Sequence, residues 1–274
     1  MGLRVNTNVS SVNAQRNLVN TTDRLQRSLE RLSSGLRITR ASDDAAGLAI
    51  SEGFRAEIRS FAQAQRNSND AISLLQIAEG ALNESSSILI RLRELAIQSS
   101  NGTLGASERT TLNNEFTALT SEISRIANVT EFNGTAVLNS ASVTVTFQVG
   151  INNTTNDRIT VTGVNATSTG LAIQSSNIST VTGAQAAISA IGAAIDTLAS
   201  LRAQFGTAQN RLESTIRSIA VAIENTSAAE SRIRDVDVAS ETAELTRNQV
   251  LQQAGIAVLA QANVTSQSAL QLLR

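Results

Sequence analysis

One stretch of the chain brings several chemistry-bearing side chains close together in the sequence. It is LSSGLRITRASDDAAGLAIS, residues 32–51, in which Asp43 and Asp44 are adjacent and serines and arginines lie nearby. Two carboxylates can share general acid and base roles or hold Mg²⁺ or Ca²⁺. A metal ion needs several converging oxygens, however, and adjacent acids point to different sides of a helix. We therefore expect no metal site and no catalytic residues here.

The same stretch has a structural explanation as a joint between two helices. Gly35 interrupts a row of leucines at helical spacing, and a glycine at such a place commonly ends a helix. Ser42 is expected to cap the next helix, with the two acids in its first turn, where they satisfy free amides and complement the helix dipole. We predict an inter-domain joint that involves Gly35, Ser42, Asp43 and Asp44.

The residue types that the chain lacks exclude most enzyme chemistry. Its 274 residues include no His, Cys, Pro, Trp or Tyr, and all 22 basic residues are Arg. Without His or Cys there is no Ser-His-Asp arrangement, no thiol nucleophile and no usual zinc site. Without Lys there is no phosphate-binding GxxxxGK loop and no Schiff base. We expect a protein that is not an enzyme and takes no cofactor.

Charge and hydropathy exclude two further classes of partner. The net charge is −1 and aromatic residues make up 2% of the chain, which does not suit nucleic-acid binding. We find no apolar run long enough to cross a bilayer, and the first residues lack the apolar core of a signal peptide. We expect no nucleic-acid partner, no membrane insertion and no cleaved signal.

Leucine and isoleucine at helical spacing mark both ends of the chain. The absence of proline also favours long, unbroken helices. We predict that the terminal helices pack through these side chains, either on each other or on other copies. The residues are Leu18, Leu25, Leu29, Leu32 and Leu36 near the start, and Leu245, Ile256, Leu259, Leu270 and Leu273 near the end.

Between these ends the pattern predicts a helical bundle with a small β region. Helical periodicity continues to about residue 130, and SVTVTFQVG and RITVTGV then alternate as in a β-hairpin. Helical spacing returns at about residue 183. The predicted fold is mainly α, with long coiled-coil-like terminal helices. We expect one domain from 1–44 and 235–274, and a helical core domain from 45–234 with its β region at about 131–180.

The terminal seams are too narrow to make two isolated helices stable. The apolar area that they bury is small beside the backbone entropy of ordering the helices. Either the ends fold only when they assemble with other copies, or they complete a bundle within one chain. On physical grounds both alternatives remain open.

Several motifs together resemble bacterial flagellin. They are NVSSVNAQRNL (8–18), LSSGLRITRASDDAAGLAIS (32–51), RLRELAIQSSNGT (91–103), EFNGTAVL (131–138) and the segment 228–273. The resemblance covers both ends and most of the helical middle. It lacks the large variable insert of longer flagellins, and the absence of Lys excludes lysine methylation.

This resemblance implies a structural subunit that polymerises into the extracellular flagellar filament for swimming motility. It implies an inner layer of paired terminal helices and export without a cleaved signal. The partners that it implies are other copies of the chain, a flagellar export chaperone, and the hook-junction and cap proteins.

The resemblance also implies recognition by an animal Toll-like receptor. The motif RLRELAIQ carries this role to Arg91 and Leu95, and LNNEFTALTSEI carries it to Glu115. Without such a receptor role, Leu95 would be explained by ordinary packing, and Arg91 and Glu115 by a surface ion pair.

Two alternative functions remain at this point. A hook–filament junction protein resembles flagellin only at its ends, so the continuous central match argues against it. A chemoreceptor-like signalling bundle, which belongs to another class, would have no β insert and would carry its most distinctive sequence at the hairpin tip.

Overall fold

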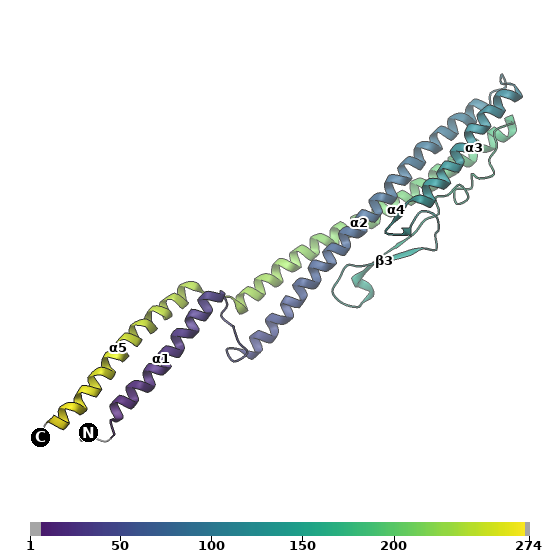
Figure 1. The fold of residues 1–274 in the computed structure, drawn as a ribbon. Helices are drawn as coiled ribbons and strands as arrows, with labels where there is room; N and C mark the ends of the chain where they lie inside the picture. The colour runs from purple at the N-terminus through teal and green to yellow at the C-terminus, as the bar shows by residue number, and fades with distance from the viewer. Residues whose placement is uncertain (1–6, 272–274) are drawn as a thin grey trace. The chain divides into compact units, whose positions relative to one another are not determined.

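The computed structural model describes residues 7–271, with side chains as far as Val264. Over this range the order is α1 (Val9–Ser34), α2 (Ala45–Ser99), α3 (Ala106–Val129), β1 (Glu131–Phe132), β2 (Thr135–Ala136), β3 (Thr144–Gln148), the 3₁₀ turn η1 (Thr155–Asp157), β4 (Arg158–Thr162), α4 (Val181–Arg234) and α5 (Val238–Gln271) (Figure 1). The predicted mainly α fold with a small β region is confirmed.

The chain divides into two compact units. The terminal unit comprises Met1–Glu57 and Asn225–Arg274, and the central unit comprises Ile58–Glu224. Both boundaries lie within long helices, α2 and α4. The terminal unit is therefore wider than the predicted domain of 1–44 and 235–274.

The central unit packs α2, α3 and α4 around one continuous apolar core. Apolar residues recur at helical spacing along each helix, so each helix presents one buried stripe. Arg202 of α4 also pairs with Glu79 of α2 at 3.7 Å. The largest buried side chains of these helices are Leu75, Leu82, Leu89, Leu92, Leu95, Phe116, Ile123 and Ile191.

Two small antiparallel hairpins follow α3. In the second, β3 pairs with β4 so that Val145 faces Val161 and Phe147 faces Ile159. Ile159 and Val161 are buried in the core, as the alternating pattern predicts. The first hairpin, β1–β2, was not predicted. Its turn is Asn133-Gly134, a dipeptide that is a strong signal for a tight hairpin.

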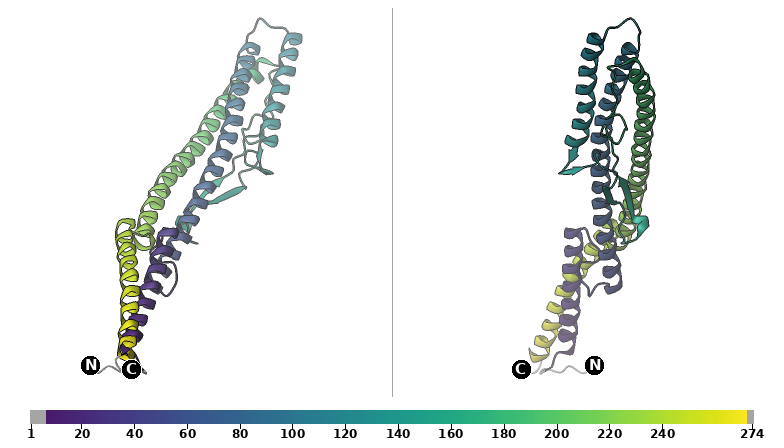
Figure 2. Two further views of the ribbon diagram at one scale, coloured as in Figure 1. Left: turned by 60° about the vertical axis from the view of Figure 1, so that its left-hand side comes forward. Right: turned by 90° about the vertical axis from the view of Figure 1, so that its right-hand side faces the viewer.

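In the terminal unit, α1 and α5 lie side by side and antiparallel (Figure 2). Asn8, at the start of α1, donates to the carbonyl of Ala262 near the end of α5, with 2.8 Å between Nδ2 and O. At the opposite end of the pair, Arg31 lies 3.6 Å from Glu241. The first and last parts of the described chain thus form one helical pair.

Candidate functional site

α1 and α5 pack along a seam, the line of side chains that each helix turns toward the other at heptad spacing. Gln252 and Thr22 lie 3.5 Å apart across this seam, and a Cβ added to Gly255 would lie 3.4 Å from Leu18 Cδ1. Every third or fourth residue on each helix is partly or fully buried, as in a coiled coil. The seam residues are Ser11, Ala14, Leu18, Thr21, Leu25, Ser28 and Leu32 on α1, and Leu245, Asn248, Gln252, Gly255, Leu259 and Ala262 on α5.

This seam is unusually polar. Ala14 is its one fully buried apolar side chain among the described residues, whereas Ser28 and Asn248 are both buried. Asn248 is 1% exposed, and neither its Oδ1 nor its Nδ2 has a hydrogen-bond partner. A buried amide without a partner costs about 1–3 kcal/mol. The α1–α5 pair is therefore weakly stabilised by its own contacts.

The ten predicted packing residues fall into three groups. Leu18, Leu25, Leu32, Leu245 and Leu259 lie on the seam, and Leu36 follows α1 in a bridge to Asp235. Leu29 and Ile256 lie outside the seam, with exposed fractions of 49% and 54%. The side chain of Leu270 and the whole of Leu273 lie outside the described residues.

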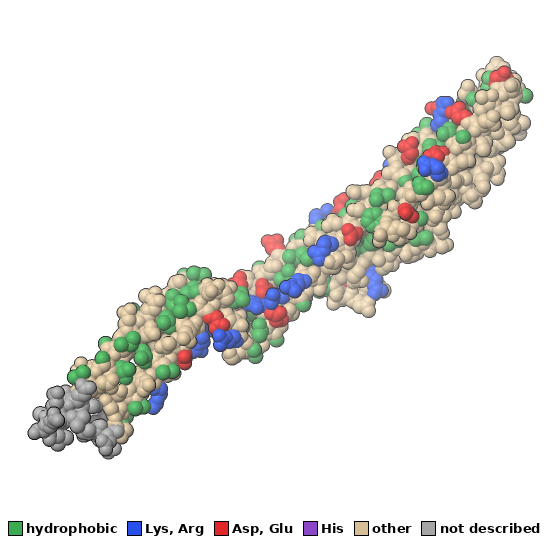
Figure 3. Space-filling view, in the orientation of Figure 1, with side chains coloured by type: hydrophobic (Ala, Val, Ile, Leu, Met, Phe, Trp, Pro, Cys, Tyr) green, Lys and Arg blue, Asp and Glu red, His purple; other side chains and the backbone are tan. Residues whose placement is uncertain are grey.

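The outward face of α5 combines exposed apolar side chains with an absence of charge. No Asp, Glu, Lys or Arg occurs in the sequence from 248 to 273. Apolar side chains gather over this helix in the space-filling view (Figure 3). Exposed apolar side chains that gather on one face commonly mark an interaction surface. The exposed members are Val250, Leu251, Ile256, Val258 and Val264.

The loop after α1 connects the two segments of the chain that make up the terminal unit through hydrogen bonds. Gly35 adopts a left-handed φ of 72°, and its N–H donates to the carbonyl of Arg31 at 2.9 Å. Val236 N–H donates to the carbonyl of Gly35 at 3.0 Å. The Arg37 guanidinium donates to the carbonyl of Ile233 at 2.5 Å. The residues between α1 and α2 are thus fixed to those between α4 and α5.

Asp43 organises this loop through its carboxylate. Its Oδ2 accepts from the backbone N–H and the hydroxyl of Thr39, at 3.2 and 3.0 Å, and from the N–H of Arg40 at 3.1 Å. Arg31 lies 3.9 Å from Oδ1. Burial opposes the charged form of Asp43, but these hydrogen bonds and the Arg31 charge outweigh it and lower its pKa. The group is therefore a structural anion.

The predicted cap at Ser42 is wrong. Asp44 caps α2 from the position before its first residue, since its Oδ1 accepts from the N–H of Gly47 at 2.8 Å, and Ser42 lies in the exposed turn before it. The difference follows from Asp43, whose hydrogen bonds to the loop keep the helix from starting earlier. The two adjacent acids therefore have separate structural roles.

Glu52 and Arg234 form a further ion pair within the terminal unit. Arg234 Nη1 lies 2.9 Å from Glu52 Oε1, which also accepts from Arg55 at 2.8 Å. The hydrogen bonds from Arg55 and Arg234 lower the pKa of Glu52. The first turns of α2 are thereby connected to the last turn of α4.

The predicted recognition residues lie in the central unit and differ in exposure. Arg91 donates to Glu115 across α2 and α3, at 3.1 Å from Nε and 3.0 Å from Nη2, and it also pairs with Glu94 at 3.0 Å. Hydrogen bonds from Arg91 to Glu94 and Glu115 raise its pKa. Both members of the Arg91–Glu115 pair are exposed, whereas Leu95 is fully buried in the core.

The described residues hold no group of three or more acidic side chains that could bind a metal ion. By length and hydropathy, one 18-residue window of α4 would suit a membrane span. Several apolar residues of α4 are buried in the core of the central unit. These are Ala184, Ala187, Ile191, Ala194, Leu198 and Phe205.

Comparison with known proteins places both ends of the chain in one family. The model of the bacterial flagellin N-terminal helical region matches residues 5–142. The model of the bacterial flagellin C-terminal helical region matches residues 188–273.

Individual relatives match over almost the whole chain. A flagellin from Halalkalibacterium halodurans is 49% identical over 270 residues, which cover 98% of this chain and 99% of that protein. A Bacillus subtilis flagellin is 42% identical, with coverage of 99% and 100%. The crystal structure of Bacillus cereus flagellin matches with a TM-score of 0.51 at 31% identity, over 56% of this chain and 88% of that one.

Proposed function

The chain belongs to the bacterial flagellin family, and we propose from this premise that α1 and α5 are the elements through which its copies assemble. The family consists of structural filament proteins, not enzymes. The chain is accordingly a self-polymerising subunit of the extracellular flagellar filament. Neither a hook–filament junction protein nor a signalling bundle is favoured by relatives that match over the full length.

The outward face of α5 is the observation that carries this proposal. It leaves Val250, Leu251 and Val258 in contact with water, and the sequence from 248 to 273 contains no charged residue beside them. Covering apolar surface is favourable by about 25 cal/mol per Å². Neighbouring copies of the chain would supply that cover along the whole helix.

A pair of equally exposed valines tests the proposal. Val258 on α5 and Val129 at the end of α3 are both 58% exposed. Val258→Asp should stop filament growth from purified subunits, as seen by negative-stain microscopy, because it places a charge on the apolar face. Val129→Asp is the matched control and should still polymerise. Normal filaments from the Val258→Asp subunit would contradict the proposal.

The polar seam favours the first of the two alternatives for the chain ends, in which they become stable on assembly. Within one copy the pair buries Ala14, Ser28 and Asn248, so few apolar contacts offset the cost of ordering two helices. Residues 1–44 and 235–274 would then form the inner layer of the filament, and 45–234 the outer layer. Removal of residues 1–36 should stop polymerisation but leave the circular dichroism signal of a folded central unit.

A subunit whose adhesive helices are exposed before assembly needs protection. The exposed apolar face of α5 after Arg247, where the sequence has no charge up to residue 273, is the surface that we propose a flagellar export chaperone covers. The hook-junction and cap proteins would meet the same terminal helices at the two ends of the filament. A chaperone that binds a subunit lacking residues 238–274 as tightly as the intact chain would contradict this assignment.

For the Toll-like receptor, the exposed pair Arg91–Glu115 offers a contact surface, while buried Leu95 would act only by supporting α2. Arg91→Glu should abolish a reporter-cell response. The double variant Arg91→Glu, Glu115→Arg restores the ion pair with reversed polarity. If the receptor reads the charges themselves, the double variant stays inactive, and a restored response would show that the pair is only structural.

A further inference from the structure

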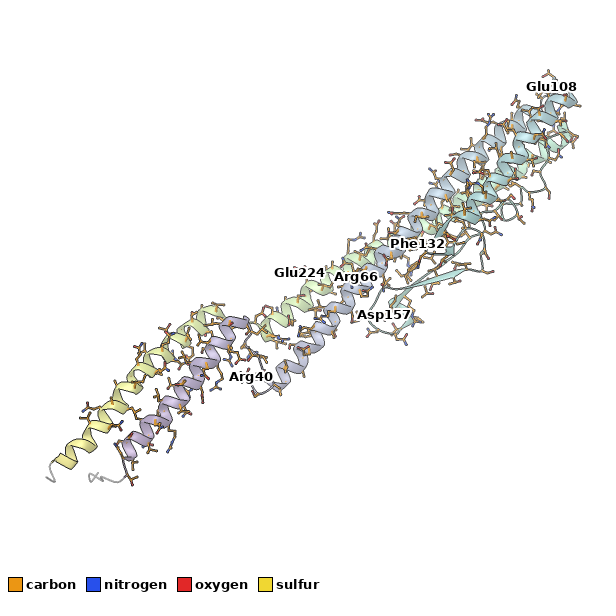
Figure 4. The ribbon with its side chains drawn as sticks, viewed as in Figure 1. Arg40, Arg66, Glu108, Phe132, Asp157 and Glu224 are labelled. Atoms are coloured by element: carbon orange, nitrogen blue, oxygen red, sulfur yellow. The ribbon has the colours of Figure 1, made fainter. Side chains whose placement is uncertain are left out.

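Two identical tripeptides lie in different backbone settings. Asn101-Gly102-Thr103 is in the loop between α2 and α3, and Asn133-Gly134-Thr135 spans the turn from β1 to β2. Both asparagine side chains are exposed. In Figure 4, Glu108 marks the start of α3 beyond the first tripeptide, and Phe132 directly precedes the second. Because the three residues are identical, a large difference in reactivity between the two sites would come mainly from the fold.

Asn-Gly sequences can react without an enzyme, because glycine carries no side chain to hinder the approach of its nitrogen. After the glycine N–H loses its proton, that nitrogen attacks the asparagine Cγ. A new N–C bond forms, the bond from Cγ to the amide nitrogen breaks, and ammonia leaves. Water then opens the resulting succinimide ring at either carbonyl, which gives aspartate or isoaspartate. Water is the one co-reactant.

The loop at Asn101 holds the reacting groups in a suitable arrangement. Thr103 N–H donates to Asn101 Oδ1 at 3.3 Å, so the side chain folds over the residue between them. This brings Cγ toward the Gly102 nitrogen and polarises the carbonyl that is attacked.

A cation acts on the peptide unit that must lose its proton. The carbonyl of Asn101 and the N–H of Gly102 belong to the same peptide unit. Arg109 Nη2 donates to that carbonyl oxygen at 2.8 Å. A guanidinium in this position stabilises the anion formed when the Gly102 N–H is deprotonated.

The turn at Asn133 opposes the same reaction. Asn133 and Gly134 have left-handed φ values of 50° and 76°, as in a two-residue hairpin turn. The pairs Phe132–Thr135 and Glu131–Ala136 hold both sides of the turn. Ring closure would rotate the Asn133 backbone and break this hairpin.

We propose that Asn101 is a site of spontaneous deamidation and that the β1–β2 turn protects Asn133. The product at 101 carries a new negative charge beside Arg109, and isoaspartate also lengthens the backbone of the α2–α3 loop. Because the subunit polymerises into an extracellular filament, the change accumulates as each filament ages.

The chain provides its own internal comparison. The purified protein is incubated at mildly alkaline pH and cleaved after arginine, which places the two sites in separate peptides, 94–109 and 126–158. Mass spectrometry should show amide-to-acid conversion several-fold faster at Asn101 than at Asn133. In denaturant the two rates should converge. Equal rates in the folded chain, or a difference that persists in denaturant, would overturn the proposal.

Two arginine variants separate the role of Arg109 from a general charge effect. Arg109→Gln should slow conversion at Asn101 and leave Asn133 unchanged. Arg125→Gln is the control, since Arg125 lies on the same helix but bonds to Glu122. If both variants slow Asn101 equally, or neither does, the Arg109 contact is not the cause.

Discussion

The central and terminal units are both built from long helices, yet they bury different kinds of side chain. In the central unit, leucine, isoleucine and phenylalanine form one continuous buried cluster. In the described part of the terminal unit, Ala14 and Ile38 are the buried apolar residues, beside polar Ser28, Ser51 and Asn248. The central unit therefore has an extensive core of its own, whereas the described terminal unit leaves apolar side chains such as Val250, Ile256 and Val258 exposed. We propose that other copies of the chain cover them.

This difference explains how one chain can be both a folded subunit and a polymerisation element. A central unit with a closed core needs no partner to hold its shape. In the assembly proposed above, a terminal pair with a polar seam and exposed apolar side chains would gain most of its stabilisation when further copies surround it.

The largest effect is expected from a cavity in the central core. Phe116→Ala should lower the free energy of unfolding of the central unit by about 3–5 kcal/mol, since Phe116 is fully buried. Urea unfolding followed by circular dichroism measures this. Val129→Ala, at an exposed position of the same helix, should change it by no more than about 0.5 kcal/mol. Similar losses for both variants would contradict the closed core.

Loss of the Asp43 charge should weaken the joint. Asp43→Asn should lower the free energy of unfolding of the terminal unit by about 1.5–3 kcal/mol, the usual contribution of hydrogen bonds to a charged group. Because the pKa of Asp43 is lowered in the folded state, its contribution is present above the unfolded pKa and is lost as pH falls through the folded pKa. In the original chain the protection of terminal-unit amides from hydrogen exchange should therefore fall at acid pH. In Asp43→Asn it should fall less. An unchanged acid dependence would exclude Asp43 as its source.

Replacing the unpartnered amide should strengthen the terminal pair. Asn248→Leu removes a buried polar group without a partner, so the α1–α5 pair should gain about 1–2 kcal/mol. Slower amide exchange in α1 and α5, with unchanged exchange in the central unit, checks this. Gln253→Leu, on the exposed face of α5, is the control. Faster exchange in Asn248→Leu would show that the amide has a stabilising partner.

Two glycine variants should have effects of opposite sign in the terminal unit. Gly35→Ala should destabilise it by about 1 kcal/mol, since φ of 72° is unfavourable for a residue with a Cβ. Gly53→Ala lies within α2 with nothing within 4 Å of the added Cβ, and should stabilise it by about 0.5–1 kcal/mol. Thermal unfolding of both variants measures the difference. A change of the same sign in both would contradict the left-handed helix end.

The smallest effect on stability is expected at the exposed ion pair. Arg91→Ala should leave the unfolding of the central unit unchanged within error, because exposed ion pairs contribute little. The same variant should still reduce the receptor response if the proposed recognition is correct. A marked loss of stability would instead assign Arg91 a structural role.

Local sequence predicted the type and order of the helices well, because their apolar residues recur with helical spacing and no proline interrupts them. The β3–β4 hairpin followed from strict alternation around Phe147 and Ile159. The β1–β2 hairpin was missed although Asn133-Gly134 signals it, because each strand has two residues and shows no alternation. The cap of α2 was predicted at Ser42 because both Ser and Asp are common capping residues. The sequence Ser42-Asp43-Asp44 therefore allows the cap at Ser42 as well as at Asp44.

The sequence by itself therefore determined the helices, the main hairpin, the exclusion of most enzyme chemistry and the resemblance to a filament family. These properties depend on residue type and spacing along the chain. The tertiary structure decided which leucines face the seam, that Leu95 is buried, that Asn248 has no partner and that Asp43 holds the loop while Asp44 caps the helix. The first three depend on which elements from distant parts of the chain meet, and periodicity within a single helix cannot specify its neighbour. The roles of Asp43 and Asp44 depend on the local path of the backbone, since both acids accept hydrogen bonds from residues within four positions of themselves.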